Sequence, residues 1–478
     1  MKKRITSLML VALLAVTGIA SSSCKKDGKK PVDNGETPVG EYEDGLNLPE
    51  IDGGGEDFDV FISYNVANQD FLAPESETGH TINDICYRRN QEVQKRFNVN
   101  FKVRPGDADY NTGTPIIRTL INSGDDTYEV FINMQHKGMP LVYEDLFVEW
   151  GENMPYVNFE NPWWYQNVLR DLNYNNKVYV AAGAYNFGCL RASEVLMFNK
   201  TVLDELNLEY PYQLVLDGEW TIDKMIEYTK AGQKDLNGDG IMDPDNDRYG
   251  VGGWMYEMMP AFFIGMGGNP VVKDDNDMPT LSINDERTFN VMNKLLEVFK
   301  DGNGGWYNTE TLKPYKHTQT MFTEGRLLFN DATLEQFSYY RDMEDDFGAV
   351  PYPKLDTDQE DYYSRIVSYS SLTFIPVTNQ KLELTSAILE NMAYLSYRDL
   401  FPAFFDEILT IKTNRDFETE VMINIARDSA RFMDENYFKS HHIYKMVEKG
   451  TNTLASDYAA SIDSWEMQLE EIIEFWEK

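Results

Sequence analysis

Hydrophobic and polar residues alternate along the chain with a period that changes from one segment to the next. Residues 59–65 (DVFISYN) alternate apolar and polar side chains with a period of two, which is typical of a half-buried strand. Residues 81–97 place apolar side chains at helical spacing, and Thr81 with Asp84 are the expected capping residues of that helix. A strand over residues 98–103, a helix over 116–121 and a strand over 128–134 follow. This βαβαβ order predicts a parallel sheet with right-handed crossovers that cover both faces.

The pattern restarts near Lys177 and predicts a second α/β lobe. Strands are expected at residues 178–182 (VYVAA) and in a segment that ends with LMFNK at Lys200. A helix is expected to begin at Thr221, where Trp220 and Met225 are spaced as a hydrophobic staple. The C-terminal part is mainly helical. It ends in an amphipathic stripe that we interpret as core packing rather than a partner site: Trp465, Leu469, Ile472, Ile473 and Trp476.

The N-terminus has the features of a targeting segment. Basic residues at positions 2–4 precede an uncharged apolar run over residues 5–20, which is shorter than the roughly 20 residues that a membrane-spanning helix needs. The run ends in SSSC, which resembles the lipobox of bacterial lipoproteins, although Ser21 stands where leucine is usual. We expect a signal peptide over residues 1–23 and a lipid on Cys24 that anchors an extracytoplasmic protein to the bacterial cell membrane. A soluble secreted protein is the alternative.

The segment after the expected cleavage point has the composition of a linker. Residues 24–55 are rich in Lys, Gly, Asp and Pro, which is typical of a flexible tether. Only Cys86 and Cys189 follow Cys24, and two widely separated cysteines do not make a disulfide framework. We interpret both as small buried hydrophobic residues, with a single bridge between them as the alternative.

Charge and composition narrow the classes of function. The 478 residues include 43 Lys plus Arg and 79 Asp plus Glu, for a formal charge of -36. Such a charge repels phosphate backbones, so we expect no nucleic-acid partner. Hydrophobic residues at 42% nevertheless supply enough apolar surface for a large core, and the length suggests two or three domains.

An acidic segment at residues 235–247 (DLNGDGIMDPDND) has the spacing of an EF-hand calcium loop. Oxygen-bearing side chains recur at alternate positions, and Gly240 stands sixth, where the turn needs a glycine. Clustered carboxylates without a cation would repel one another, which favours calcium over an empty acidic turn. Asn246 stands where the pattern requires a bidentate glutamate, so Asp247 or Asp245 has to close the coordination sphere. We expect a structural calcium ion rather than magnesium, held by Asp235, Asn237, Asp239, Asp243, Asp247 and the carbonyl of Ile241.

Several further segments stand in a fixed order along the chain. The longest covers residues 210–250 and includes the acidic loop. Shorter ones are ESETGHTINDICYRRN (residues 75–90), NPWWYQN (161–167), NKVYVAAGAYN (176–186), MFNKTVLDELNL (197–208), EGRLLFNDA (324–332) and IPVTN (375–379). In this order they resemble the carbohydrate-type, family 1-like extracellular solute-binding proteins of bacterial ABC importers, in particular their calcium-loop branch. The resemblance covers the chain from about Asp59 to its end.

The resemblance implies an α/β protein with the two-lobe periplasmic-binding-protein fold (class II), each lobe a mainly parallel sheet flanked by helices. The chain would cross between the lobes near Gly183, near Ile366 and near Thr410. A ligand held between two rigid lobes contacts both, so its binding energy favours the closed state. Lobe 1 is expected over residues 56–182 and 366–410, and lobe 2 over residues 183–365 and 411–478.

Sugars present flat C–H faces and rings of hydroxyl groups, so a sugar site needs aromatic platforms flanked by hydrogen-bonding side chains. By the resemblance, such residues stand where strand ends meet the cleft. For the aromatic residues the alternative is core or surface packing, and for Asp331 and Arg365 it is a cap or a surface ion pair. The expected ligand-binding residues are Gln135, Tyr185, Asn186, Trp254, Tyr256, Asp331, Arg365 and Tyr369.

The expected function is capture of an extracytoplasmic carbohydrate, an oligosaccharide, by a monomer that delivers it to the permease subunits of an ABC transporter. The chain has no HExxH, GxSxG or Walker-type motif, and we expect no catalytic residues. A calcium-dependent glycosidase or lyase is the enzyme alternative, since carboxylate pairs are plentiful. A helical SusD-like surface glycan-binding lipoprotein is another alternative, and peptides or other solutes are alternative ligands.

Overall fold

The computed structural model describes residue 46 and residues 48–64, 74–299, 306–308, 314–410, 417–433 and 441–478. Residues 47–478 form one compact unit. The expected signal peptide, the expected lipid on Cys24 and residues 24–45 of the expected tether lie outside the described residues. In the described part of the chain, no helix is both long enough and apolar enough to cross a membrane.

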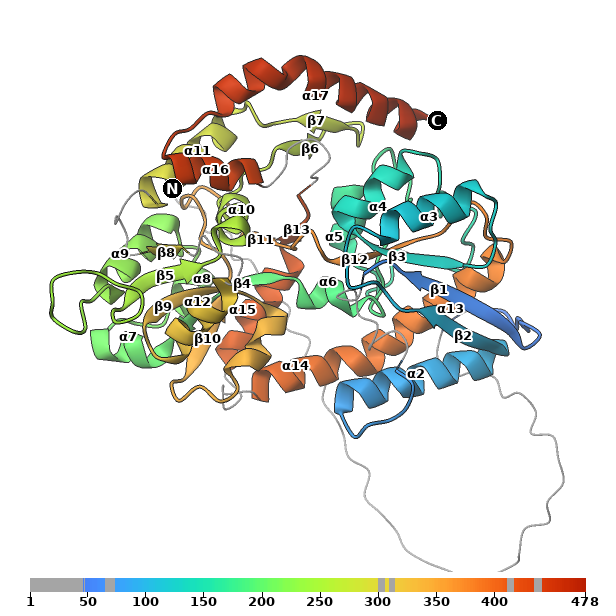
Figure 1. Ribbon diagram of the computed structural model, residues 1–478, viewed down its shortest axis with the longest axis horizontal. Helices are drawn as coiled ribbons and strands as arrows, with labels where there is room; N and C mark the ends of the chain where they lie inside the picture. Colours follow the sequence, from blue (N-terminus) through green and yellow to red (C-terminus); the bar gives the residue numbers. More distant parts are fainter. Residues whose placement is uncertain are drawn as a thin grey trace, which may run out of the picture. The chain divides into compact units, whose positions relative to one another are not determined.

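The first sheet has four strands and forms the centre of lobe 1 (Figure 1). Strand β1 lies between β2 and β3 and runs parallel to both, and β12 pairs antiparallel with β3. The order along the chain confirms the predicted βαβαβ run. The strands are β1 (Glu56–Ile62), β2 (Val99–Arg104), β3 (Val130–Met134) and β12 (Ser371–Phe374); the helices are α2 (Thr81–Phe97), α3 (Gly113–Asn122), α4 (Gln135–Val142), α5 (Gln166–Leu172) and α13 (Leu382–Leu395).

The strand sequences divide their side chains between two buried clusters in lobe 1. Phe61 and Phe131 belong to one cluster, whereas Val60 and Ile132 belong to the other. Successive side chains in a strand point to opposite faces of the sheet, so helices covering both faces leave every residue of β3 buried.

Helix α2 has the predicted bounds but not the expected N-terminal cap. His80 is its N-cap and makes no side-chain cap hydrogen bond, so the expected cap at Thr81 is wrong. The Asp84 carboxylate instead accepts the N–H of Thr78 at 2.7 Å and of Gly79 at 3.1 Å. Asn98 ends the helix in the left-handed region at φ 47°.

The second sheet has five strands in the order β10-β4-β9-β5-β8 and forms the centre of lobe 2. Strand β5 runs parallel to β8 and β9, whereas β4 pairs antiparallel with β9 and β10. The strands are β4 (Glu194–Asn199), β5 (Tyr249–Gly253), β8 (Trp306–Asn308), β9 (Leu327–Thr333) and β10 (Phe347–Val350). The helices are α7 (Lys200–Leu206), α8 (Tyr212–Leu216), α9 (Ile222–Gly232), α10 (Met255–Gly265), α11 (Glu286–Phe299), α12 (Pro314–Thr323), η1 (Leu334–Tyr340), α15 (Phe417–Asp428) and α16 (His441–Lys449).

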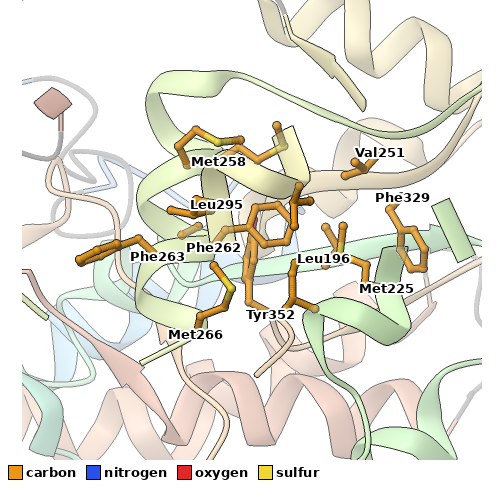
Figure 2. Packing of buried hydrophobic residues seen from close by; sticks show 14 of the residues in the cluster. Leu196, Met225, Val251, Met258, Phe262, Phe263, Met266, Leu295, Phe329 and Tyr352 are labelled. Carbon is orange, nitrogen blue, oxygen red and sulfur yellow. The ribbon is translucent and has the colours of Figure 1, made fainter. Parts of the chain in front are cut away.

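A large apolar cluster fills lobe 2 between its sheet and helices (Figure 2). Leu196, Val251 and Phe329 extend from three neighbouring strands, and Phe262 extends from α10. Helix α10 is buried on nearly all sides, as expected for a helix that is apolar all round. Trp220 and Met225 lie in the same cluster on either side of the N-cap of α9.

The two cysteines after the N-terminal region match their interpretation as hydrophobic residues. Cys86 and Cys189 are free and buried, so the alternative of a single bridge between them is wrong.

Two connections between the lobes lie side by side. The first follows residues 178–182, which are not the expected strand: Ala181 makes only an isolated bridge to Thr373. The chain continues through α6 (Phe187–Arg191) to Ser193, which bridges Ile366 on the returning connection. Short strand β11 (Ser364–Arg365), just before Ile366, pairs with β13 (Ala430–Arg431).

A third connection is helical. Helix α13 packs in lobe 1 through residues such as Met392, and it continues through η2 (Ser396–Leu400) into α14 (Phe401–Thr410). Phe404 of α14 lies in a cluster with Val195 and Leu327 of the lobe 2 sheet. This change of lobe lies N-terminal to Thr410, the expected position.

Two further elements contact both lobes. Helix α17 (Leu454–Glu477) buries Leu454 in the lobe 2 cluster and Trp476 in a lobe 1 cluster, although residues 411–478 were expected in lobe 2. The hairpin of β6 (Val271–Lys273) and β7 (Pro279–Leu281) follows α10, yet Val271 is buried among lobe 1 side chains. The Asn175 N–H donates to the hairpin carbonyl of Asp277 at 3.0 Å.

Candidate functional site

A cavity of about 330 Å³ is lined by residues from both lobes. Lobe 1 contributes the end of α5 and Tyr174, and lobe 2 contributes Tyr363 and residues within 264–273, from the end of α10 to β6. Arg431 of β13 and the following Phe432 also line it. Small-molecule sites in proteins have volumes of roughly 300 to 1,000 Å³, so this cavity is large enough for a ligand of one or two sugar rings.

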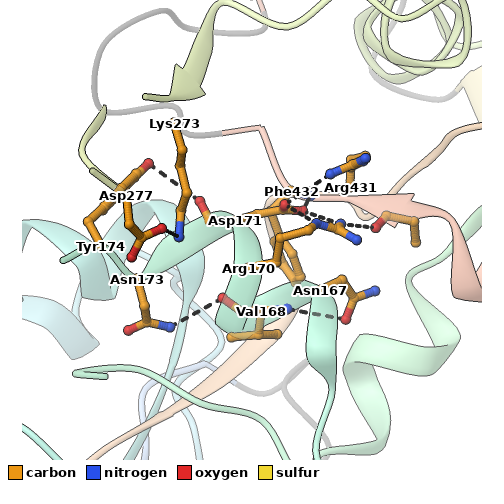
Figure 3. A network of polar contacts seen from close by, with 11 residues as sticks. Asn167, Val168, Arg170, Asp171, Asn173, Tyr174, Lys273, Asp277, Arg431 and Phe432 are labelled. Atoms are coloured by element: carbon orange, nitrogen blue, oxygen red, sulfur yellow. Dashed lines mark hydrogen bonds and ion pairs between the residues drawn. The ribbon is translucent and has the colours of Figure 1, made fainter. Parts of the chain in front are cut away.

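Asp171 organises one side of this cavity (Figure 3). Arg170 donates from Nε and Nη2 to its two carboxylate oxygens, at 2.5 and 2.7 Å. Arg431 Nη1 lies 3.5 Å from Oδ1, and the Phe432 N–H donates to Oδ2 at 3.0 Å. Arg170 also donates to the carbonyl of Ala430 at 2.8 Å. One carboxylate, whose side chain is 10% exposed, therefore attaches the β13 segment to α5.

Lys273 lies on the opposite element of the cavity, in the β6–β7 hairpin. Its Nζ is 2.6 Å from Asp277 Oδ1 and 5.1 Å from the ring centre of Tyr174. Asp277 Oδ2 in turn accepts the N–H of Asn176 at 2.9 Å. The hairpin thus presents a cation to the cavity while its turn is bound to lobe 1.

Aromatic rings supply the apolar part of the lining. Tyr174 and Phe432 are buried, whereas Tyr363 is half-buried. The Arg431 guanidinium lies over the Tyr363 ring at 4.8 Å. Rings beside hydrogen-bonding groups are the combination that sugar recognition requires.

Two of the expected ligand residues, Arg365 and Asp331, lie in one buried cluster of charges rather than on an open surface. Arg365 is 1% exposed, and its Nη1 donates to Glu257 Oε2 at 2.6 Å and lies 3.4 Å from the Glu194 carboxylate. Tyr352 donates its hydroxyl hydrogen to Asp331 Oδ1. Burial raises the pKa of Asp331 to about 7 and raises the pKa of Glu194 as well.

Three of the four expected aromatic residues, Trp254, Tyr256 and Tyr369, are near Glu257 of this cluster, either in the chain or in space. Trp254 and Tyr256, at the start of α10, are stacked with ring centres 5.1 Å apart, and Tyr256 lies 5.4 Å from Tyr444 of α16. All are half-buried. Burial raises the pKa of Tyr369, and the Glu257 carboxylate adds to this effect.

Gln135, Tyr185 and Asn186 lie in the interior. Gln135 is 1% exposed and donates from Nε2 to the carbonyl of Met433 at 2.8 Å, so it contacts the segment after β13. Tyr185 donates to Thr373 Oγ1 at 3.2 Å within the lobe 1 core, and Asn186 Nδ2 lies 3.5 Å from the same oxygen. None of the eight expected residues is among the described residues that line the 330 Å³ cavity.

Sequence reasoning missed the residues that do line it. Arg170, Asp171 and Tyr174 follow the NPWWYQN segment, but only the pairing of β11 with β13 brings Arg431 to them. The one local signal is that Arg170, Asp171 and Tyr174 lie close together in the chain, with the charge pair at the end of α5 and the ring just after it.

The acidic loop folds into a turn whose carboxylates accept backbone N–H groups. Asp235 accepts from Gly238 at 2.6 Å and from Gly240 at 2.8 Å, and Gly240 takes the left-handed φ of +81° that favours glycine. Asp247 accepts from Leu236 and Asp243, both at 2.8 Å. The backbone therefore makes a tight turn over these residues.

The side chains fit a cation less well than the backbone does. Among the described residues, no three His, Cys, Asp or Glu side chains are grouped so that they could hold a metal ion. The expected ligands Asp239 and Asp243 use carboxylate oxygens to accept local N–H groups, from Ile241 and Asp245.

The chain matches no protein-family model, and no curated protein is significantly similar to it. Solved structures are similar in fold. UgpB from Mycobacterium tuberculosis in complex with glycerophosphocholine aligns with a TM-score of 0.58 and 13% identity, over 87% of this chain and 99% of that one. The ABC substrate-binding protein Lmo0181 from Listeria monocytogenes, in complex with cycloalternan, has a TM-score of 0.54 and 12% identity over the same shares.

A third structure has the same relationship. The cyclo/maltodextrin-binding protein complexed with maltotetraose has a TM-score of 0.54 and 14% identity, over 88% of this chain and 96% of that one. Together with the two sheets and their connections, these similarities show that the chain has the two-lobe periplasmic-binding-protein fold.

Proposed function

We propose that this protein is the substrate-binding component of an ABC importer, which captures an extracytoplasmic carbohydrate and delivers it to the permease. The observation that carries the proposal is the 330 Å³ cavity, lined by α5 of lobe 1, by residues 264–273 of lobe 2 and by the β13 segment. Structures of the same fold hold maltotetraose and cycloalternan. A binding role without catalysis is part of the proposal.

The lining explains how binding would act on the lobes. A sugar ring against Tyr363 and hydroxyl groups bonded to Asn269 and the Asp171 network would contact both lobes at once. Such a ligand has more contacts when the lobes are together, so its binding energy shifts the population toward that state. We propose that the protein acts as a monomer, since one chain supplies both sides of the cavity.

A thermal-shift screen against mono- and oligosaccharides, amino acids and short peptides tests the proposal. A ligand at a hundred times its dissociation constant stabilises the folded state by about 2.7 kcal/mol, which gives a clear rise in Tm. Tyr363→Ala should abolish the rise, whereas Tyr339→Ala, which removes a 50% exposed tyrosine elsewhere in lobe 2, should retain it. A response to peptides or amino acids alone would overturn the carbohydrate assignment.

The alternatives make different predictions. A glycosidase or lyase would return a shortened glycan after incubation, whereas a binding protein returns it intact. The SusD-like alternative requires a helical-repeat body, and the two sheets of this structure argue against it.

Lipid anchoring at Cys24 is a separate part of the proposal, supported by the basic, apolar and SSSC segments of the N-terminus. Mass spectrometry of the membrane fraction should find a lipid on Cys24, and Cys24→Ala should release the protein from that fraction. Ser22→Ala leaves the cysteine in place and should not.

A structural calcium ion at residues 235–247 is likewise proposed, on the ligand order and the Gly240 turn. The residues that would hold it are Asp235, Asn237, Asp239, Asp243 and Asp247, with the carbonyl of Ile241. Calcium should raise Tm, a chelator should lower it, and Asp239→Asn should weaken both responses. Asp275→Asn, which removes an exposed carboxylate from the β6–β7 turn, should leave them unchanged. A Tm that ignores calcium and chelator would refute the site.

A further inference from the structure

We infer that the carbohydrate bound in the 330 Å³ cavity carries an anionic group, a carboxylate, sulfate or phosphate, which is recognised by Arg431 and Lys273. This inference rests on the proposed function and specifies its class of substrate. It starts from the charges of the lining: among the described residues there, Arg170, Lys273 and Arg431 are basic and Asp171 is the one acid.

The local sign of charge is opposite to that of the whole chain. A formal charge of -36 would repel an anion at long range, but salt screens exposed charges beyond about 8 Å at physiological ionic strength. Inside a cavity, the nearest side chains therefore decide which ligands are favoured. A neutral sugar needs no such group of cations.

Asp171 does not neutralise the positive charge of both Arg170 and Arg431. This carboxylate already accepts two N–H groups of Arg170 and the N–H of Phe432. Arg431 lies farther away, at 3.5 Å, and its side chain is 32% exposed. One carboxylate neutralises one of the two guanidinium groups, so a positive charge remains beside the cavity.

Arg431 is also held in position to bind an anion. Its guanidinium lies over the Tyr363 ring at 4.8 Å, which leaves the edges of the planar group for a carboxylate, sulfate or phosphate oxygen. Lys273, 25% exposed, extends from β6 over Tyr174 (Figure 3). Because the two cations come from separate elements, one anion would connect β13 with the β6–β7 hairpin.

Calorimetry with the full protein compares oligogalacturonides, sulfated disaccharides and glucose 6-phosphate with neutral malto-oligosaccharides of the same lengths. We expect one anionic series to bind at least about tenfold more tightly than its neutral counterpart, with an affinity that falls as salt rises. The series that binds identifies the carboxylate, sulfate or phosphate as the recognised group.

Variants that should weaken binding of the anionic ligand, and one that should strengthen it, test the roles of these residues. Arg431→Gln and Lys273→Gln should each weaken the anionic ligand about tenfold. Asp277→Asn should strengthen it, because it frees Lys273 from its ion pair while asparagine still accepts the Asn176 N–H and tolerates the φ of 61° at this position. Lys224→Gln removes an equal charge from the surface of α9 and should change nothing.

The outcomes separate this inference from the proposed function. Neutral sugars that bind as tightly as anionic ones, with no effect of Arg431→Gln or Lys273→Gln, would overturn the anionic group and leave carbohydrate capture intact. Failure of every carbohydrate to bind would overturn both. Inorganic sulfate or phosphate that binds without any sugar would show a simple anion site and also overturn the inference.

Discussion

At the scale of single residues, Asp331 shows how the tertiary structure changes the chemistry of a side chain. The sequence places it at a strand end, as one of eight expected ligand contacts. In the structure it is 7% exposed and lies among carboxylates and Arg365, where burial raises its pKa to about 7. The other charged residues of the cluster are Glu194 of β4, Glu257 of α10 and Arg365 of β11, so no local sequence pattern predicts that they meet.

Asp331 should make stability fall as the pH rises. Its folded-state pKa lies above its unfolded value, so the folded state binds more protons between about pH 4 and 7 and loses stability across that window. The raised pKa of Glu194 acts in the same direction. Denaturant unfolding at pH 5 and pH 7 should show a smaller loss for Asp331→Asn than for the wild type. The exposed Asp342→Asn should behave like the wild type, and three equal losses would contradict the prediction.

At the scale of elements, the starts of two helices show that a threonine predicted near a helix start caps the helix in one case and not in the other. Thr221 caps α9 by accepting the Lys224 N–H at 3.3 Å, as its sequence context predicts. Thr81 has the same residue type at an expected helix start, yet it lies inside α2, and Asp84 accepts the preceding N–H groups. A hydroxyl acts as a cap only when its own residue stands in extended backbone before the first helical residue, as Thr221 does, whereas Thr81 is already helical.

Alanine at the two threonines should therefore have different effects. Thr221→Ala should lower the free energy of unfolding by about 1 kcal/mol, because it leaves an N–H of the first turn without its acceptor. Thr81→Ala removes an exposed side chain and should change stability by less than about 0.5 kcal/mol. Chemical denaturation measures both, and Thr221→Ser should retain most of the cap. Equal losses for both alanine variants would refute the assignment.

At the scale of the molecule, helix α17 and the β6–β7 hairpin add contacts between the lobes to the three chain connections. Trp476 is fully buried among Tyr174 and Tyr179, with ring centres 5.4 and 5.2 Å away. The same helix begins with Leu454 in the lobe 2 cluster. The closing motion that the proposed function requires would therefore have to accommodate these two elements as well.

Truncating Trp476 should be costly. Trp476→Ala removes a large buried side chain and should lower the free energy of unfolding by about 3 to 5 kcal/mol. Met467→Ala in the same helix removes a side chain that is 55% exposed and should cost less than about 0.5 kcal/mol. Thermal and chemical unfolding give the comparison, and a small loss for Trp476→Ala would mean that the end of α17 is not packed in solution.

The sequence alone determined the elements with strong periodicity: α2 with its predicted bounds, the βαβαβ run of lobe 1, the helix after Thr221 and the C-terminal stripe, of which Ile472 and Trp476 are buried. These follow from local rules, since burial on one or both faces imposes the period of the side chains. Residues 178–182 failed as a strand because an apolar run forms a strand only where a neighbour supplies its hydrogen bonds, and Ala181 finds a single bridge.

The tertiary structure alone decided which side chains meet. Arg170 and Arg431 are far apart in the chain and share one carboxylate only because β13 pairs beside β11 and lies against α5. The charge of a cavity depends on such long-range pairings, whereas hydrophobic periodicity records only burial. The fold could therefore be predicted from the sequence, whereas the residues that line the candidate site could not.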